Sequence, residues 1–460
     1  MSRNGGPCVV RAAAMPTGTP AVPVAIVGAG ACGLSAALML RDAGVEVVLL
    51  ERDALPQGST ALSSGFVPAG GTAVQRAAGV TDDSPARFAA DIQAKAHGTA
   101  APHLVRAYTE AISPALDALA QRHGLRFELL DGFLYPGHGV RRMHTLAERT
   151  GAALVGALAA AAERAGAMLV TDALVRELWC TSGDAGGGRV LGIGYRRPDG
   201  RIEHLACEVL LLACNGFGGN RAMVAELLPE MREATFGGHV GNDGSAIAWA
   251  RALGLRLADL GGYQGHGSWA VPQGVLVTWA LMAEGGLQVN AAGRRFHDET
   301  QGYSEAAVHV LAQPGGVAWN VFDERLLALG RGFPDFRDAE AAGALRRADS
   351  IDSLATLIGC DAATLADTLA TARYRLRPPL YAIKVTGALF HTQGGIDIDE
   401  GCRALQADGT PHPNLLAAGG AARGVSGNAV WGYLSGNGLL SAVAGGFIAA
   451  HTAHGLLVAR

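Results

Sequence analysis

The sequence has no long uninterrupted apolar run and no strong excess of charge of either sign. Its 460 residues include 37 lysines and arginines and 41 aspartates and glutamates, which gives a formal net charge of −4. No apolar segment reaches the roughly 18 residues expected of a membrane span. The near-neutral balance also lacks the basic surface that nucleic-acid binding requires. We therefore expect neither a membrane nor a nucleic acid as a partner.

Cysteines are few and scattered. The seven form no CxxC pair, so the spacing typical of zinc or iron–sulfur ligands is missing and no metal site is predicted. Residues 1–22 contain Arg3 and Arg11 but lack the continuous apolar core of a signal peptide. We interpret residues 1–22 as a disordered tail and expect a cytoplasmic protein. The sequence leaves the oligomeric state open.

Glycine, by contrast, is abundant. The 65 glycines cluster in short motifs such as "GAGACG", "GFGG" and "SGNG" rather than in a low-complexity tract. Such clusters often allow the backbone to approach a ligand closely. With 49% hydrophobic residues, the chain has enough apolar material for a large core and more than one domain.

The strongest local motif lies near the start of the chain. A β-branched run ending at Val27 enters "GAGACG", a helical stretch follows, and a second apolar run ends at Glu51. In such a strand–turn–helix–strand unit, Gly28 permits the tight turn, Gly30 lets the backbone approach a pyrophosphate, and Gly33 allows the helix to pack on the strand. Glu51 stands where an acid accepts a hydrogen bond from a ribose hydroxyl. The unit predicts dinucleotide binding.

The next segment, residues 51–72, distinguishes FAD from NAD. It offers hydroxyls and bare backbone to a long ligand, whereas NAD domains of this type usually proceed to another helix. We therefore favour FAD. The candidate contacts in this segment are Arg52, Ser59, Thr60, Ser63, Ser64 and Gly65.

Several motifs together carry a family resemblance. They are "VAIVGAGACGLSAALML", "GSTALSSGF", "LLACNGFGGN" and "NLLAAGGAARGVSGNAVWGYLSGNGLLSA". With them the chain resembles, from about Pro23 on, the fumarate reductase/succinate dehydrogenase flavoprotein superfamily, in the branch of 3-ketosteroid and tricarballylate dehydrogenases. The resemblance implies an α/β fold: a Rossmann-type FAD-binding domain (23–260 and 391–460) interrupted by a smaller α+β capping domain (261–390).

The resemblance also implies further cofactor contacts. Val175 would pass the adenine, and a helix opening at Asn437 would turn its N-terminus, with the amide of Leu439, toward the N1–C2=O edge of the flavin. Ser59 stands where related succinate dehydrogenases carry a histidine joined covalently to FAD, so non-covalent FAD is expected. The remaining positions implied to close the FAD site are Asn215, Gly216 and Gly420.

Two histidines match substrate-binding histidines of the fumarate reductases: His266 in "GGYQGHGSW" and His391 in "FHTQGG". An imidazole can hydrogen-bond a carbonyl or carboxylate oxygen and stabilise the charge that develops there. Tyr303 and Tyr433 are candidate proton donors or acceptors. The alternative for both tyrosines is that they only pack the domain interface.

Three arginines of the fumarate reductases are missing from the matching segments 277–286, 298–307 and 424–436. Because arginine supplies bidentate recognition of carboxylates, their absence argues against a small dicarboxylate. We expect a more apolar pocket instead. The side chains expected to line it, besides the tyrosines, are Trp269, Trp279, Met282 and Trp431.

The predicted function is that of an FAD-dependent oxidoreductase. It would dehydrogenate or reduce a carbon–carbon bond next to a carbonyl of a mostly apolar small molecule, with hydride transfer at flavin N5 and an external electron acceptor or donor. Two alternatives stay open: a fumarate reductase-like reductase of an unsaturated carboxylate, and an electron-transfer flavoprotein subunit of a larger complex. The direction of the reaction is also open.

Overall fold

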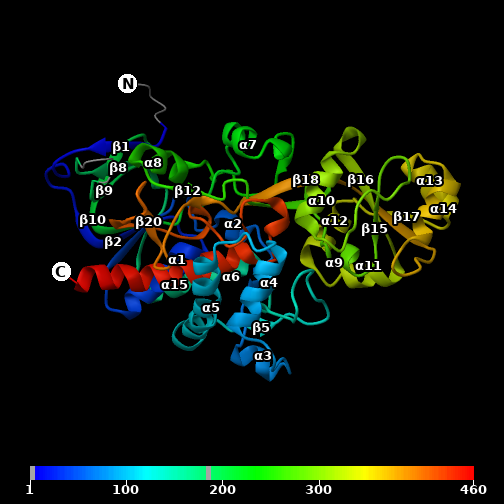
Figure 1. Ribbon diagram of the computed structural model, residues 1–460, viewed down its shortest axis with the longest axis horizontal. Helices are drawn as coiled ribbons and strands as arrows, with labels where there is room; N and C mark the ends of the chain where they lie inside the picture. Colours follow the sequence, from blue (N-terminus) through cyan, green and yellow to red (C-terminus); the bar gives the residue numbers. More distant parts are fainter. Residues whose placement is uncertain (1–5, 183–187, 460) are drawn as a thin grey trace.

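The computed structural model describes residues 6–182 and 188–459. Figure 1 shows a larger lobe, which contains both ends of the chain, and a smaller lobe of helices α9 to α14 around its own sheet. The smaller lobe is an insertion in the larger one, so the chain has an α/β fold with a capping domain. The division at 260/261 and 390/391 remains our proposal.

The larger lobe is built on a nine-stranded sheet of order β1-β8-β9-β10-β2-β3-β7, with β21 beside β10 and β20 beside β21. Its centre is parallel: β2 pairs with β3 and β10, and β10 with β21. Residues Val24 to Ile26 of β2 are fully buried, as expected of a strand covered on both faces. The strands are β1 Cys8–Arg11, β2 Ala21–Val27, β3 Val47–Leu50, β7 Met168–Val170, β8 Leu174–Cys180, β9 Val190–Arg196, β10 Ile202–Leu212, β20 Arg403–Leu405 and β21 Pro411–Ala417.

Strand β1 corrects the prediction of a disordered tail over residues 1–22. Cys8–Arg11 pairs in parallel with Glu177–Cys180 of β8, and the amide of Ala12 donates to the carbonyl of Cys180. The edge of β8 would otherwise leave unpaired backbone groups, which an extended segment satisfies. The sequence alone does not show this partner because it lies far along the chain. Residues 1–5 lie outside the described residues.

Helices and short strands complete the larger lobe. Its helices are α1 Ala31–Asp42, α2 Gly58–Ala61, α3 Ala73–Ala77, α4 Pro85–Lys95, α5 Pro102–His123, α6 Gly151–Arg164, α7 Arg221–Leu227, α8 Ser245–Leu253 and α15 Asn437–Val458. Its short strands are β4 Val67–Pro68, β5 Glu128–Leu129, β6 Met143–Thr145, β11 Thr235–Phe236, β12 Leu257–Ala258 and β19 Gly395–Ile396.

Helix α15 is, within residues 6–182 and 188–459, the one helix long and apolar enough to cross a membrane by length and composition. It packs against α1 and α5 (Figure 1). A Cβ at Gly446 would lie 2.3 Å from the carbonyl oxygen of Cys32, so α15 crosses α1 at very close range. The apolar character of α15 is therefore that of a core helix.

The capping domain is built on a seven-stranded sheet of order β14-β13-β18-β16-β15, with β11 and β17 also on β18. Strands β13 and β18 pair antiparallel from Tyr263↔Thr392 onward, so the chain enters and leaves the capping domain side by side. Its elements are β13 Tyr263–Ala270, β14 Val275–Leu276, α9 Ala280–Ala283, β15 Leu287–Val289, α10 Tyr303–Leu311, β16 Val317–Asp323, α11 Glu324–Gly330, α12 Pro334–Ala341, β17 Arg346–Ala348, α13 Ile351–Ile358, α14 Ala362–Ala370 and β18 Leu380–Thr392.

Candidate active site

A cavity of about 1650 Å3, part of it open to solvent, lies where the two lobes meet. Its lining comes from both lobes and extends from Gly28 and Glu51 in the larger lobe to His266 and Tyr303 in the smaller one. Most of the predicted site residues line it: Gly28, Gly30, Glu51, Arg52, Ser59, Thr60, Ser63, Ser64, Val175, Asn215, His266, Tyr303, His391, Gly420, Tyr433 and Leu439. The predicted site residues that are not among the lining residues are Gly33, Gly65, Gly216 and Asn437.

The turn between β2 and α1 explains its glycines. Gly28 has φ of 107°, and a Cβ there would lie 2.5 Å from the carbonyl oxygen of Ala213. A Cβ at Gly33 would lie 2.0 Å from the carbonyl oxygen of Gly28. Gly33 therefore serves helix packing, as predicted, and the N-terminus of α1 is brought to the cavity wall. The amide of Ala31 there donates to Oγ1 of Thr60 at 3.0 Å.

Glu51 is buried at the end of β3, beneath this turn. Its Oε2 accepts from the amide of Ala29 at 2.9 Å and its Oε1 from the amide of Asp53 at 3.1 Å. Burial raises the pKa of the Glu51 carboxyl, while the two amides oppose that shift. Each carboxylate oxygen has a second lone pair, which leaves acceptors for a ligand hydroxyl in the cavity.

The Glu51→Gln variant is expected to bind FAD at least about 10-fold more weakly. The glutamine side chain would place its N–H₂ group against the backbone amide of Ala29 or of Asp53, where both groups are donors. It would also remove one acceptor for the ribose hydroxyl of the cofactor, and the loss amounts to about 1–3 kcal/mol. Fluorescence titration of the apoprotein with FAD measures the change. Glu208→Gln, which is outside the cavity lining, serves as the control. An unchanged dissociation constant for Glu51→Gln would contradict the assignment.

Ser59 is fixed from two sides. Its Oγ accepts from Nδ2 of Asn215 at 3.0 Å and from Nδ2 of Asn242 at 2.8 Å. Asn215 itself has a positive φ of 66°, a conformation that asparagine tolerates, and its Oδ1 accepts from the amide of Gly216. The sequence reasoning missed Asn242, because only the fold brings it to the serine segment.

The residues present fit a flavin dinucleotide. The N-termini of α1 and of the 22-residue α15 both reach the cavity, where their free amides favour anionic groups. Backbone without side chains lines the wall between them: a Cβ at Gly420 would lie 2.1 Å from Oδ1 of Asn215 and 2.7 Å from Nε2 of His391. Pyrophosphate would lie at α1 and the ring system beside Gly420 and α15.

A family profile described as an FAD binding domain matches residues 23–439. The chain belongs to this family. FAD is therefore its cofactor, as the sequence predicted, and the smaller lobe caps an FAD-binding domain.

Known proteins agree with this assignment. The chain is 28% identical over 433 residues to fumarate reductase (cytochrome) of Shewanella frigidimarina, covering 88% of this chain and 73% of that protein. It is 26% identical over 528 residues to 4-oxocyclohexanecarboxylate 2-dehydrogenase of Sinomonas cyclohexanicum, covering 88% of each. The open conformation of a flavocytochrome c3 fumarate reductase matches with a TM-score of 0.80 at 25% identity, covering 95% of this chain and 79% of that one. The superfamily resemblance is confirmed, and the protein is an FAD-dependent oxidoreductase.

The two predicted histidines come together at the end of the cavity formed by β13 and β18. His266 is buried, its Nδ1 accepts from the amide of Ser268 at 3.1 Å, and burial lowers its pKa to about 3. His391 lies 2.7 Å from Nε2 of Gln393 through its Nδ1, and burial lowers its pKa to about 4. Both imidazoles are thus neutral at pH 7 and available as hydrogen-bonding groups.

Tyr303 and Tyr433 line the cavity together with the two histidines. The ring of Tyr303 stacks on His266 with centroids 4.8 Å apart and meets Tyr433 edge-on at 6.0 Å. Burial raises the pKa of both phenols, that of Tyr433 to about 12. They therefore keep their protons at neutral pH and are able to donate hydrogen bonds. Both belong to the apolar core of the cap and also line the cavity, so packing and ligand contact are compatible.

The prediction that Trp269, Trp279, Met282 and Trp431 line the cavity is wrong. Trp279 is buried behind His266, Trp269 packs on Phe390, and Trp431 is 45% exposed beside His97. Met282 is a core residue of the cap. Other apolar side chains line the cavity, and they come from separate segments that no spacing in the sequence links; they include Phe66, Tyr135, Met143, Trp249, Leu276 and Phe390.

Arginine is scarce around the cavity. Among the lining residues within 6–182 and 188–459, the one arginine is Arg52. Its Nη1 donates to the carbonyl of Gly241 at 2.7 Å and meets Asp243, beside Glu51 and away from the two histidines. The end of the cavity with the histidines and tyrosines therefore offers neutral donors rather than a cationic clamp.

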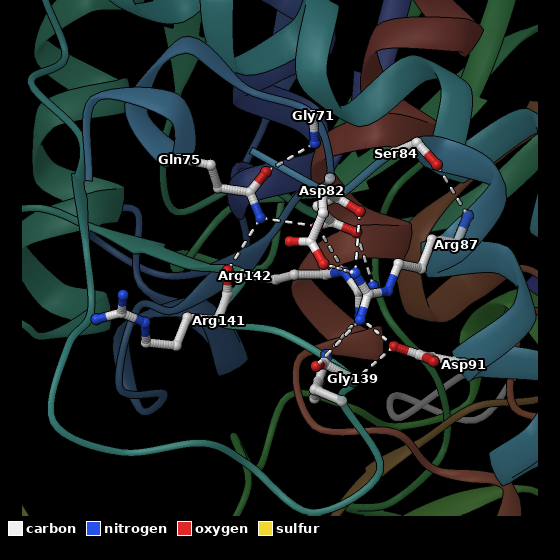
Figure 2. A network of polar contacts seen from close by, with 12 residues as sticks. Gly71, Gln75, Asp82, Ser84, Arg87, Asp91, Gly139, Arg141 and Arg142 are labelled. Atoms are coloured by element: carbon white, nitrogen blue, oxygen red, sulfur yellow. Dashed lines mark hydrogen bonds and ion pairs between the residues drawn. The ribbon is translucent and has the colours of Figure 1, made fainter. Parts of the chain in front are cut away.

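A buried ionic network stiffens the cavity wall around Tyr135 and Met143 (Figure 2). The fully buried guanidinium of Arg142 donates to both oxygens of Asp83 at 2.8 Å and also pairs with Asp91. Next to it, Nε2 of His138 lies 2.9 Å from the carbonyl oxygen of Ser435, a lining residue. The two carboxylates share one guanidinium, so removing Arg142 would leave the buried Asp83 without its charged partner.

One ion pair joins the two lobes. Lys95, the last residue of α4, pairs with Glu305 of α10, and its Nζ also donates to the carbonyl of Gln301 at 2.7 Å. Their side chains are only 13% and 11% exposed. The pair thus holds the capping domain against the FAD-binding domain beside the cavity.

The Lys95→Met variant is expected to open the cap more often and to lose about 3 kcal/mol of stability, because it leaves Glu305 buried without its partner. Hydrogen exchange in α10 and thermal unfolding measure the two effects. Adding Glu305→Gln removes the uncompensated charge and is expected to restore most of the stability. If the single variant exchanges and melts like the wild type, the pair has no such role.

Proposed function

We propose that this protein dehydrogenates or reduces a carbon–carbon bond next to a carbonyl group in a mostly apolar small molecule. When bound, FAD supplies the two-electron chemistry, taking or giving a hydride at N5. The chain's own residues bind the carbonyl compound, exclude water and hold the protons. An external electron acceptor or donor completes the cycle.

The main support is the set of neutral donors at one end of the cavity. His266, His391 and the phenols of Tyr303 and Tyr433 converge there, and the described residues place no arginine among them. Neutral donors stabilise the charge that builds on a carbonyl oxygen when hydride and proton leave or reach the adjacent carbons. A dicarboxylate would instead bring charge to a site without a cationic partner.

The apolar side chains supply the rest of the substrate contacts. Phe66, Leu276 and Phe390 line the same cavity and suit a hydrocarbon ring or chain. Burial raises the pKa of Tyr433 to about 12, so this phenol keeps its proton at neutral pH. It is our candidate for the proton donor. One relative carries the name 4-oxocyclohexanecarboxylate 2-dehydrogenase, which combines a cyclic ketone with dehydrogenation.

A substrate panel tests the proposal. FAD-loaded protein is mixed anaerobically with saturated cyclic ketones, and its reduced form with enones and with fumarate, while the flavin absorbance is followed. Bleaching by a ketone or reoxidation by an enone at least about 100-fold faster than by fumarate is the expected result. Rapid turnover of fumarate would favour the alternative, a reductase of unsaturated carboxylates. No response to any compound would favour an electron-transfer subunit.

We also propose that FAD is bound without a covalent link. Ser59, whose hydroxyl is engaged by two asparagine amides, stands in the segment where a linking histidine would be needed. Precipitation of the protein with acid is expected to release all of the yellow colour into the supernatant. Colour retained in the pellet would contradict this.

A further inference from the structure

A chain of buried polar side chains leads from the start of α15 to His391. Nδ2 of Asn437 lies 2.9 Å from Oγ of Ser426, and that Oγ lies 3.1 Å from Oε1 of Gln393. Nε2 of Gln393 then lies 2.7 Å from Nδ1 of His391. Asn437, Ser426 and Gln393 are 0%, 1% and 3% exposed, so water does not compete for these bonds.

The chemistry of each group fixes the direction of the chain. The amide nitrogen of Asn437 only donates, so the oxygen of Ser426 accepts from it. The carbonyl oxygen of Gln393 only accepts, so the hydroxyl of Ser426 gives its proton to Gln393. The amide nitrogen of Gln393 only donates, so Nδ1 of His391 must be unprotonated. A neutral His391 then carries its proton on Nε2.

We propose that Gln393, Ser426 and Asn437 are positioning residues that hold His391 in the Nε2–H tautomer, so that this N–H is a fixed donor for the carbonyl oxygen of the substrate. The inference rests on the proposed function for the identity of the acceptor, but not for the tautomer itself. The Nε2 atom lies beside Gly420 in the cavity wall, only 2.7 Å from where a Cβ would stand. The absence of a side chain at Gly420 leaves this nitrogen room to act.

The need for such a chain follows from the chemistry of imidazole. A neutral ring has two tautomers of similar energy, and only one of them donates from Nε2. His266 is fixed by a single backbone amide that donates to its Nδ1, whereas His391 depends on side chains from three separate segments. A histidine held in the wrong tautomer loses most of its catalytic value.

The Asn437→Asp variant offers a way to reverse the chain. A carboxylate only accepts, so Ser426 would donate to it, and Gln393 would turn its nitrogen toward Ser426 and its oxygen toward His391. His391 would then carry its proton on Nδ1. Position 437 is the first residue of α15, where the helix N-terminus stabilises a negative charge. Oδ1 of Asn437 has no partner among the described residues, so the exchange breaks no other bond there.

Nitrogen NMR of FAD-loaded protein labelled with ¹⁵N-histidine tests the proposal, with His391→Gln to assign the signals. In the wild type we expect Nδ1 of His391 to be unprotonated and Nε2 to carry the proton. In Asn437→Asp we expect the two signals to exchange. A wild-type His391 protonated on Nδ1 overturns the proposal, and so does a variant that keeps the wild-type tautomer.

Gln393→Leu gives a second test that does not depend on how position 437 folds. It removes the last bond of the chain, so both nitrogens of His391 are expected to be partly protonated. A single Nε2–H tautomer in this variant would overturn the proposal. Thermal unfolding and FAD content confirm that each variant is folded.

Turnover separates this inference from the proposed function. With the ketone or enone substrate, Asn437→Asp is expected to be about 100-fold slower, the usual effect of losing one donor to a developing oxyanion. If the tautomer reverses and turnover does not change, the chain of positioning residues stands, and His391 as the substrate donor fails. If turnover falls while the tautomer stays, the loss has another cause and the inference fails.

Discussion

Replacing His391 by alanine is expected to lower turnover about 100- to 1,000-fold while the protein keeps its FAD. The loss corresponds to one hydrogen-bond donor removed from the site where charge builds in the transition state. FAD retention is expected because we assign cofactor binding to the turn at Gly28, to Glu51 and to the N-termini of α1 and α15, all of which the substitution leaves intact. Single-turnover reduction of the flavin and titration of the apoprotein measure the two properties.

Two variants sharpen this experiment. His391→Gln keeps an N–H donor and is expected to recover part of the rate. His412→Ala removes another buried histidine, one that bonds the carbonyl of Gly188 outside the cavity lining, and is expected to lose stability but not turnover. Equal loss of FAD affinity and turnover in His391→Ala would show that His391 supports the cofactor rather than the substrate.

The second large effect expected is a loss of folding stability as the pH falls from about 6.5 toward 4. Burial lowers the pKa of six histidines in the folded protein, to about 3 for His266 and about 4 for four others, below the usual value of about 6.5. Between these pH values the histidines bind protons in the unfolded chain but stay neutral in the folded protein. The free energy of unfolding therefore falls as the pH falls. The six are His138, His144, His266, His297, His391 and His412.

Each such histidine contributes up to about 1.4 kcal/mol per pH unit. Burial raises the pKa of Glu51, Glu305 and Asp335. These three carboxyls increase the free energy of unfolding as the pH falls, but they are fewer than the six histidines, which decrease it. Urea unfolding at a series of pH values measures the slope. His412→Gln is expected to reduce the slope of the free energy of unfolding against pH by the contribution of one histidine. A free energy of unfolding that stays constant between pH 7 and 5 would contradict the buried, neutral histidines.

The cofactor half of the site was largely predictable. Gly28, Gly30, Glu51 and Thr60 lie within one continuous segment, where the backbone of the turn after β2 donates to Glu51 and Thr60. Local geometry of this kind is encoded over a few residues, so the motif alone identifies the ligand class. The sequence did not predict Asn242, which donates to the hydroxyl of Ser59 from a loop far along the chain.

The substrate half was predictable only in part. A family pattern predicts His266 and His391 as substrate-binding residues; that role stays a prediction, and the paired strands β13 and β18 place both side chains at the cavity. The apolar lining was predicted wrongly, because the side chain of Trp269 packs on Phe390 and that of Trp279 on His266, and neither lines the cavity. Which face of a strand or helix a residue presents depends on the elements packed against it, and the sequence pattern does not contain that information.

By itself, then, the sequence determined the dinucleotide unit, the identity of the cofactor and the lack of arginine in residues 277–286 and 424–436. The tertiary structure decided that residues 8–11 form a strand, which aromatic side chains face the cavity, and how Asn437, Ser426 and Gln393 reach His391. The physical reason is the range of the interactions. Turns and helix starts are settled by neighbours in the chain, whereas strand partners, cavity walls and buried hydrogen-bond chains are settled by residues that only folding brings together.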